Sequence, residues 1–136
     1  MNALLNPAPT RARILIVDDE LDNRELLQII LSWSGFVTET AESAEAALKC
    51  IAAESPDLIL LDLMMPGIDG YQLTALLKQN PETRNIPVIM LSAMSDSATR
   101  DRALSTGADA YITKPIDRSE LCEQVRGVLD LAAARA

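Results

Sequence analysis

Short apolar segments alternate with longer amphipathic segments along most of the chain. The short segments are rich in aliphatic or β-branched residues and cover residues 13–18, 36–40, 57–62, 88–92 and 110–113. Three of them are nearly continuous apolar runs, which is typical of strands that are covered on both faces of a sheet. The segment 36–40 (FVTET) instead alternates apolar and polar residues. We therefore expect five strands, with the second at an edge of the sheet.

The longer segments have the spacing of amphipathic helices, and most carry a start or stop signal. We expect helices at residues 23–34, 44–53, 70–79, 95–106 and 118–132. Capping patterns open four of them: Asp22 with Glu25, Ser43, Asp69 with Gln72, and Asp117 with Glu120. Gly35 and Gly107 directly follow two of the expected helix ends.

The alternation of five strands with five helices predicts an α/β fold. Short connections between such elements favour a parallel sheet with right-handed crossovers and helices on both faces. The length of 136 residues suits a single domain. We expect this domain at residues 13–132, between a flexible N-terminal tail at 1–12 and a C-terminal tail at 133–136.

The charge and composition of the chain argue against several classes of function. The chain has 12 Lys and Arg against 20 Asp and Glu, a net charge of −8, which argues against binding to nucleic acid or to anionic lipid. It has no histidine, which excludes Ser-His-Asp and Cys-His nucleophiles, histidine-ligated zinc and a role as phosphohistidine donor. Cys50 and Cys122 have no Cys-x-x-Cys spacing and are interpreted as small hydrophobic residues in a reducing compartment. With no secretion signal and no membrane-length apolar run, we expect a cytoplasmic protein.

Several polar side chains follow the strands of the predicted sheet. Ligands of such sheets bind at the carboxyl ends of the strands, where the winding direction reverses. The first strand ends at Asp18, Asp19 and Glu20, the third at Asp62, the fourth at Ser92 and the fifth at Thr113 and Lys114. We therefore expect the carboxylates of Asp18, Asp19 and Asp62, the Ser92 hydroxyl and the Lys114 ammonium group at one edge.

The chemistry of this set points to phosphorus and a hard metal ion. Two carboxylates about 4 Å apart repel each other by about 4 kcal/mol at an effective dielectric of 20, so a cation is needed. Lys114 supplies one positive charge, and oxygen ligands suit Mg²⁺. A carboxylate beside Mg²⁺ and a lysine can attack phosphorus to form an aspartyl phosphate, and the Ser92 hydroxyl can donate a hydrogen bond to a phosphoryl oxygen. No glycine-rich phosphate loop follows the first strand, so nucleotide binding is unsupported.

Each residue also has a purely structural interpretation. Asp18, Asp19 and Asp22 could be helix-start carboxylates favoured by the helix dipole, and Asp62 could be a loop residue ahead of Pro66. Lys114 with Pro115 forms a common turn sequence. Asp57 and Asp109 lie at the opposite ends of their strands and are expected to be structural, while Glu20 and Asp69 are expected to be solvated or capping. The functional interpretation depends on the joint placement at one edge.

Four motifs taken together resemble the receiver domain of two-component response regulators. They are ILIVDDE at residues 14–20, PDLILLDLMMPGIDG at 56–70, IPVIMLSA at 86–93 and GADAYITKP at 107–115. The resemblance covers roughly residues 13–131, and no matched position departs from the family pattern. It implies a flavodoxin-like fold with strand order 2-1-3-4-5, and a cis peptide commonly precedes the proline at the position of Pro115 in this family.

The resemblance also implies a role for each site residue. Asp62 would be the phosphoacceptor and Lys114 would contact the phosphoryl group. Asp19 would bind Mg²⁺ directly and Asp18 through water, with Asp62 and the Met64 backbone carbonyl as further metal ligands. Ser92 would be the switch hydroxyl and Tyr111 the switch aromatic.

The function implied is that of a stand-alone, single-domain response regulator that is not an enzyme beyond its own phosphorylation and dephosphorylation. A histidine kinase or a histidine phosphotransfer protein would supply the phosphoryl group. Phosphorylation would then switch the face built by the fourth helix, fifth strand and fifth helix, so that it binds a downstream protein. A homodimer formed on phosphorylation is a further candidate assembly. Two alternatives stay open: a receiver fragment of a larger hybrid kinase or output-enzyme regulator, and a small flavin- or nucleotide-binding module.

Overall fold

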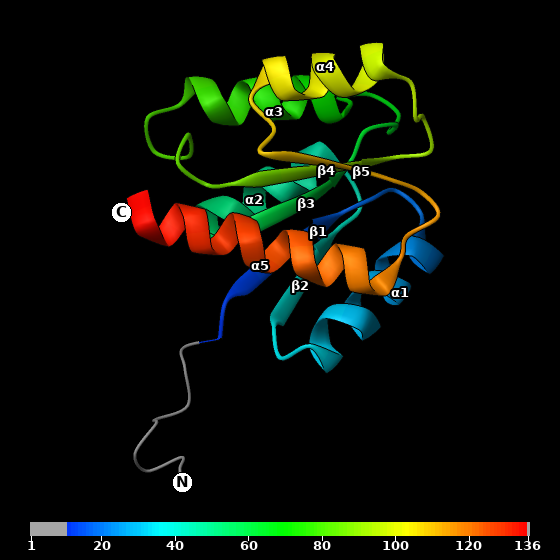
Figure 1. The fold of residues 1–136 in the computed structure, drawn as a ribbon. Helices are drawn as coiled ribbons and strands as arrows, with labels where there is room; N and C mark the ends of the chain where they lie inside the picture. Colours follow the sequence, from blue (N-terminus) through cyan, green and yellow to red (C-terminus); the bar gives the residue numbers. More distant parts are fainter. Residues whose placement is uncertain (1–10, 136) are drawn as a thin grey trace, which may run out of the picture.

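A five-stranded parallel sheet lies between two layers of helices in the computed structural model, which describes residues 11–135 (Figure 1). The strands lie in the order β2-β1-β3-β4-β5, which confirms the expected flavodoxin-like topology. They are β1 (Arg13–Val17), β2 (Val37–Ala41), β3 (Leu58–Asp62), β4 (Val88–Ser92) and β5 (Ala110–Thr113). Every neighbouring pair is parallel, so all five strands end at the same edge of the sheet.

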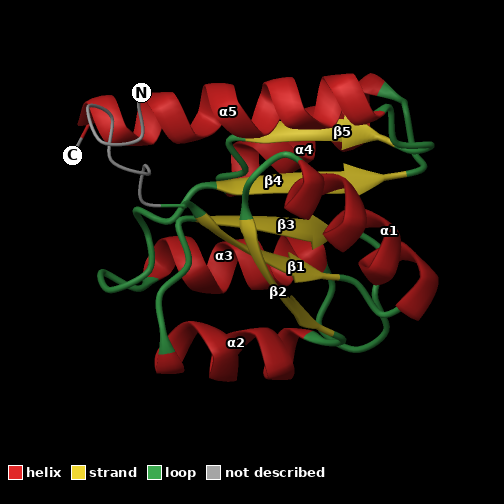
Figure 2. Ribbon diagram, turned by 90° about the horizontal axis from the view of Figure 1, so that it is seen from below, coloured by secondary structure: helices red, strands yellow, loops and turns green. Residues whose placement is uncertain are grey.

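All five expected helices are present, and they divide between the two faces of the sheet (Figure 2). They are α1 (Leu21–Trp33), α2 (Ala44–Ala53), α3 (Gly70–Gln79), α4 (Ser97–Thr106) and α5 (Arg118–Arg135). Residues of α1 and α5 share one apolar core with the sheet, and residues of α2 and α3 share the other. A smaller apolar cluster joins α4 to β4 and β5.

Burial along the strands follows the expected pattern. Every residue of β3 and β4 is buried, whereas β2 keeps one residue exposed and three half-buried. This agrees with the prediction that the alternating segment forms an edge strand. The residues that end β3 and β4 are therefore held by a strand with neighbours on both sides.

The first turn of α1 differs from the sequence prediction. The helix begins at Leu21, with Glu20 at the N-cap position and no side-chain cap, so the capping box expected from Asp22 and Glu25 was wrong. The reason lies in the preceding turn, where the N–H of Glu20 donates to Asp18 Oδ1 at 2.9 Å and fixes the chain before Asp22 is reached. The helix also ends at Trp33, one residue before the expected end.

Two other helix boundaries also differ from those predicted. Helix α4 begins at Ser97 instead of residue 95, because Asp96 is the N-cap and accepts the N–H of Thr99 at 2.9 Å. Helix α5 continues to Arg135, so residues 133–135, expected in a C-terminal tail, are helical instead. Their alanine-rich sequence has high helix propensity. Most of the tail expected at 1–12, and residue 136, lie outside the described residues.

Two further capping predictions are confirmed, whereas at α5 Asp117 Oδ1 accepts the N–H of Ser119 at 2.9 Å and the box expected with Glu120 stays a prediction. Ser43 Oγ accepts the N–H of Ala46, and Asp69 with Gln72 forms a reciprocal capping box at the start of α3. Both cysteines are free thiols. Within residues 11–135, no helix has the length and apolar character needed to span a membrane.

Candidate functional site

Three carboxylates meet at the edge where the strands end. Asp18 and Asp19 follow β1, and Asp62 is the last residue of the neighbouring strand β3. One carboxylate oxygen from each residue lies within 4.8 Å of the others. Asp18 and Asp62 are buried, with 1% and 4% of their surface exposed, whereas Asp19 is exposed. The predicted convergence is therefore present, and it has one side open to solvent.

Lys114 brings a cation from β5 to the buried pair. Its Nζ lies 3.0 Å from Asp62 Oδ1 and 3.5 Å from Asp18 Oδ2. Its N–H donates to the Ser92 carbonyl at 2.7 Å, which anchors its backbone beside β4. Its peptide bond to Pro115 is cis, as the resemblance implied. One ammonium group faces three carboxylates, so the cluster keeps an excess of negative charge.

The Asp18 carboxylate is held in place but is only half satisfied. Its Oδ1 accepts the N–H of Glu20, and the guanidinium of Arg24 donates to the Asp18 backbone carbonyl at 2.8 Å. Its Oδ2 is buried and accepts no hydrogen bond from the described residues, and its one ion-pair partner among them is the Lys114 ammonium group at 3.5 Å. A buried carboxylate oxygen normally has a partner. This oxygen without a hydrogen bond, together with an all-oxygen donor set, fits a hard divalent cation such as Mg²⁺.

The environment of Asp62 works against its own ionisation. Burial, together with the neighbouring charges of Asp18 and Asp19, raises the pKa of Asp62 to about 6 despite the opposing hydrogen bond and charge of Lys114. The pKa of Lys114 is raised above its ordinary value, because its hydrogen bond to Asp62 and the charges of Asp62 and Asp18 outweigh the effect of burial. The site thus pairs Asp62, whose ionised form is disfavoured, with Lys114, whose protonated form is favoured.

The Ser92 hydroxyl lies at the end of β4, the strand next to β3. Ser92 is 1% exposed. The preceding residue, Leu91, pairs with Asp62 across β3 and β4, which places Ser92 beside the carboxylate cluster. Its Oγ accepts the N–H of Met94 at 3.1 Å. The hydroxyl therefore has its own proton available for donation.

Tyr111 contacts the same loop from β5. Its ring is already buried, with 6% exposed, and its OH donates to the Met94 carbonyl. Met94 thus links Ser92, through its N–H, with Tyr111, through its carbonyl. Sequence reasoning missed this link because a backbone carbonyl leaves no residue-type signal.

The site also contains contacts that the sequence did not suggest. Arg24 on α1 reaches back to the Asp18 carbonyl, and Gly70 at the start of α3 donates its N–H to the Leu63 carbonyl at 2.9 Å. Met64, whose carbonyl was expected as a metal ligand, lies two residues after Asp62 with a 64% exposed side chain. Its ligand role, like the roles of the other site residues, stays a prediction.

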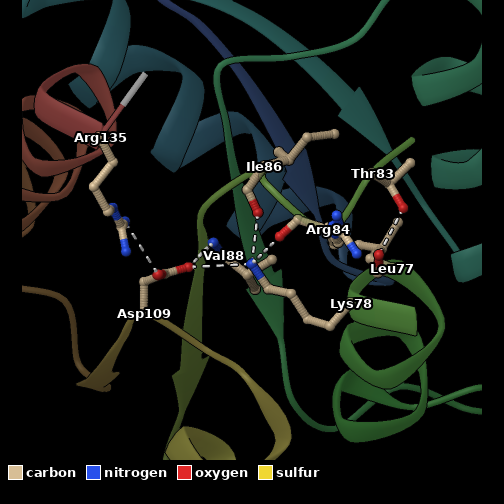
Figure 3. A network of polar contacts seen from close by, with 8 residues as sticks. All are labelled: Leu77, Lys78, Thr83, Arg84, Ile86, Val88, Asp109 and Arg135. Carbon is tan, nitrogen blue, oxygen red and sulfur yellow. Dashed lines mark hydrogen bonds and ion pairs between the residues drawn. The ribbon is translucent and has the colours of Figure 1, made fainter. Parts of the chain in front are cut away.

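The opposite edge of the sheet holds a separate polar network (Figure 3). Asp109 Oδ2 accepts the N–H of Val88 at 2.8 Å and lies 3.5 Å from the ammonium group of Lys78. Lys78 also donates to two carbonyls of the loop before β4, and Arg135 approaches Asp109 at 3.9 Å. Asp57 accepts the N–H of Arg13 at 2.7 Å on the same edge. These contacts agree with the structural roles expected of Asp57 and Asp109.

Comparisons with known proteins agree with this geometry. A family model for the response regulator receiver domain matches residues 14–126. The phosphate regulon transcriptional regulatory protein PhoB of Escherichia coli is 44% identical over 117 residues, which are 86% of this chain and 51% of PhoB. The response regulator PleD of Caulobacter vibrioides is 42% identical over 117 residues, which are 86% of this chain and 26% of PleD. The chain thus spans about half or less of these relatives.

A solved structure shows the same fold. The crystal structure of a putative response regulator from Chloroflexus aurantiacus has a TM-score of 0.86 and 35% sequence identity. The match covers 89% of this chain and 99% of that one. The site described above therefore lies in a fold that another response regulator chain shares over its whole length.

Proposed function

This chain belongs to the response regulator receiver domain family, and from that premise we propose that the carboxylate of Asp62 accepts a phosphoryl group. One observation carries the proposal: Asp62 is buried at the end of β3, 3.0 Å from the Lys114 ammonium group and beside Asp18 and Asp19. No other residue of the cluster combines burial at the strand end with a direct lysine contact at this distance. Family membership does not favour the flavin- or nucleotide-binding alternative.

The reaction assigned to Asp62 is a transfer between two nucleophiles. A carboxylate oxygen of Asp62 forms the new bond to phosphorus, while the phosphorus–nitrogen bond of a donor phosphohistidine breaks and the imidazole nitrogen keeps the electron pair. Lys114, already 3.0 Å from Asp62, lies where it can pair with the charge on the transferring group. Since these 136 residues contain no histidine, the donor histidine lies outside them, and we propose that a histidine kinase or a histidine phosphotransfer protein supplies it.

A divalent cation is part of this proposal. Asp18, Asp19, Asp62 and the Met64 carbonyl would hold Mg²⁺, which supplies positive charge to the phosphoryl oxygens when bound. The Oδ2 of Asp18, which accepts no hydrogen bond from the described residues, and the negative excess of the cluster support this assignment. The exposed side of the cluster, at Asp19, is the side from which a hydrated ion and a donor can approach.

The output of the phosphorylated chain is proposed to be a change at the α4–β5–α5 face. A phosphoryl oxygen on Asp62 would attract the Ser92 hydroxyl, whose oxygen accepts the N–H of Met94 in this structure. The Met94 carbonyl in turn accepts the hydroxyl of Tyr111. A local shift would thus reach α4 through the chain of Ser92, Met94 and Tyr111. We propose that the altered face binds a protein target or a second copy of this chain, and not nucleic acid or a membrane.

The acceptor assignment is tested by labelling with a small-molecule donor. Wild-type protein incubated with acetyl phosphate and Mg²⁺ should gain the mass of one phosphoryl group, located at Asp62 by peptide mapping. Asp62→Asn should gain none, while the control Asp22→Asn, an exposed acid on the first turn of α1, should be labelled like wild type. Full labelling of Asp62→Asn would refute the acceptor assignment, and labelling of wild type without Mg²⁺ would refute the role proposed for the cation.

A further inference from the structure

Helix α4 is attached to the domain by little apolar packing. Only Thr99 and Ala103 are buried along its ten residues, and the remaining positions are mostly charged or polar. A helix that is polar on nearly all sides gains little from the hydrophobic core. The position of α4 therefore depends on a small number of specific side-chain contacts.

One of these contacts comes from α3, which lies beside α4 (Figure 1). The Tyr71 hydroxyl donates to the Thr99 carbonyl at 3.4 Å. The guanidinium of Arg102 lies over the same ring, 4.0 Å from its centroid, a cation–π distance. One tyrosine ring thus contacts two successive turns of α4.

The start of α3 is fixed against the phosphoacceptor. A Cβ atom at Gly70 would lie 2.8 Å from Leu63 Cα and 2.9 Å from the Asp62 carbonyl oxygen, so this position has no room for a side chain. Its N–H also donates to the Leu63 carbonyl. Tyr71 directly follows Gly70, so its backbone continues from a residue that packs against the backbone of Asp62, the proposed phosphoacceptor.

Two tyrosines therefore contact the segment 93–99, which runs from the end of β4 into the first turn of α4. Tyr111 holds Met94 at the beginning of this segment, and Tyr71 holds Thr99 in the first turn of α4. Met94 is connected to Ser92, whereas Tyr71 is connected to Asp62 through Gly70. The two attachments reach the same segment by separate routes.

We infer that Tyr71 and Arg102 form a latch that keeps α4 in the position described here and sets how readily α4 moves when Asp62 is modified. This inference rests on the proposed function. A contact that stabilises one position of a helix lowers the population of every other position. Exposed cation–π pairs of this kind shift such populations by about two- to fivefold.

The latch is tested by hydrogen–deuterium exchange of the α4 amides. Arg102→Gln and Tyr71→Leu should each accelerate exchange at residues 97–106 by about two- to fivefold, without change in α2. Arg100→Gln is the matched control, because Arg100 is exposed on the same helix and loses the same charge. Arg102→Gln should add no further acceleration in the Tyr71→Leu background, because its partner ring is then absent.

A second measurement addresses the regulation. With Mg²⁺ and beryllofluoride, a phosphoryl mimic, the beryllofluoride concentration that gives half of the exchange change in α4 should fall in Arg102→Gln, by at most about fivefold, and stay unchanged in Arg100→Gln. Equal effects of the two arginine variants, or an undiminished effect of Arg102→Gln without the Tyr71 ring, would overturn the latch. Acetyl phosphate labelling of the same proteins separates the two hypotheses: unlabelled wild type refutes the proposed function, whereas labelled variants with unchanged α4 exchange refute the latch alone.

Discussion

At the scale of single residues, Asp62 is placed where its negative charge destabilises the fold. Burial, Asp18 and Asp19 together raise its pKa to about 6, from an ordinary value of 3.8. Between these two values the folded chain binds more protons at this group than the unfolded chain does, so the free energy of unfolding falls as the pH rises. The contribution of protonated Asp62 to the free energy of unfolding is complete below about pH 4 and is lost as the pH rises through 6.

Asp62→Asn should therefore stabilise the metal-free protein. In EDTA the variant should exceed wild type in free energy of unfolding by about 1–3 kcal/mol at pH 7. The gap should be about 1 kcal/mol smaller at pH 5, where part of the wild-type population is protonated. Urea unfolding of both proteins at the two pH values measures this difference, and a gap independent of pH would show that Asp62 is not the responsible group.

Two methionines near the site should affect how long a phosphoryl group persists. Met64 and Met94 lie two residues after Asp62 and Ser92, with side chains 64% and 45% exposed. A thioether offers no hydrogen-bond donor and only a weak acceptor, so neither side chain orients a hydrolytic water well. The phosphorylated protein should accordingly be long-lived, and Met64→Asn and Met94→Gln should each accelerate phosphoryl loss severalfold.

This prediction is measured as decay of purified phosphoprotein in Mg²⁺. Leu76→Asn provides the control, because Leu76 is 46% exposed on α3 and the change is equally polar. Both methionines lie at the surface, so an alternative is that they leave water access unaffected. Unchanged or slower decay in the two polar variants would support that alternative.

At the scale of secondary-structure elements, the start of α3 sets the geometry of the site. Gly70→Ala should destabilise the protein by about 1–3 kcal/mol, because the new Cβ would lie within 3 Å of the backbone of Asp62 and Leu63. It should also slow labelling by acetyl phosphate, since the acceptor backbone must shift. Gly127→Ala on α5 has open space around it and should instead gain up to about 1 kcal/mol. Thermal unfolding of the two variants compares them, and equal stabilities would contradict the packing argument.

The elements also show what the sequence could and could not predict. The strands and helices were predictable because buried strands and amphipathic helices leave periodic patterns. The convergence of Asp18, Asp19, Asp62 and Lys114 was predictable because strand ends meet at one edge of a parallel sheet, while their roles stay predictions. The start of α1 could not be predicted from the capping pattern. The Asp18 carboxylate accepts the N–H of Glu20 and forms a turn there, so the helix begins at Leu21, ahead of Asp22. The Met94 link and the Tyr71 contact to α4 depend on backbone carbonyls and on helix placement, and neither leaves a pattern in the sequence.

At the scale of the whole molecule, the carboxylates that would hold Mg²⁺ come from two separate strands. Binding to the folded chain alone should raise its stability, by about 2.7 kcal/mol at a Mg²⁺ concentration one hundred times the dissociation constant. Asp19→Asn should lose more of this Mg²⁺-dependent increase than Asp18→Asn, if the exposed Asp19 is the direct ligand. The increase in melting temperature on adding Mg²⁺ measures this effect, and a larger loss in Asp18→Asn would reverse the assignment of the two acids.

The parallel sheet also sets when, during synthesis, the carboxylate and lysine cluster can first be complete. The residues around the acceptor come from β1, β3 and β5, and Asp18 and Lys114 are 96 positions apart in the sequence. A nascent chain that has left the ribosome only as far as β4 carries all three carboxylates but not the lysine that pairs with them. The contact between Lys114 and Asp62 can therefore form only after β5 has been translated and has paired with β4.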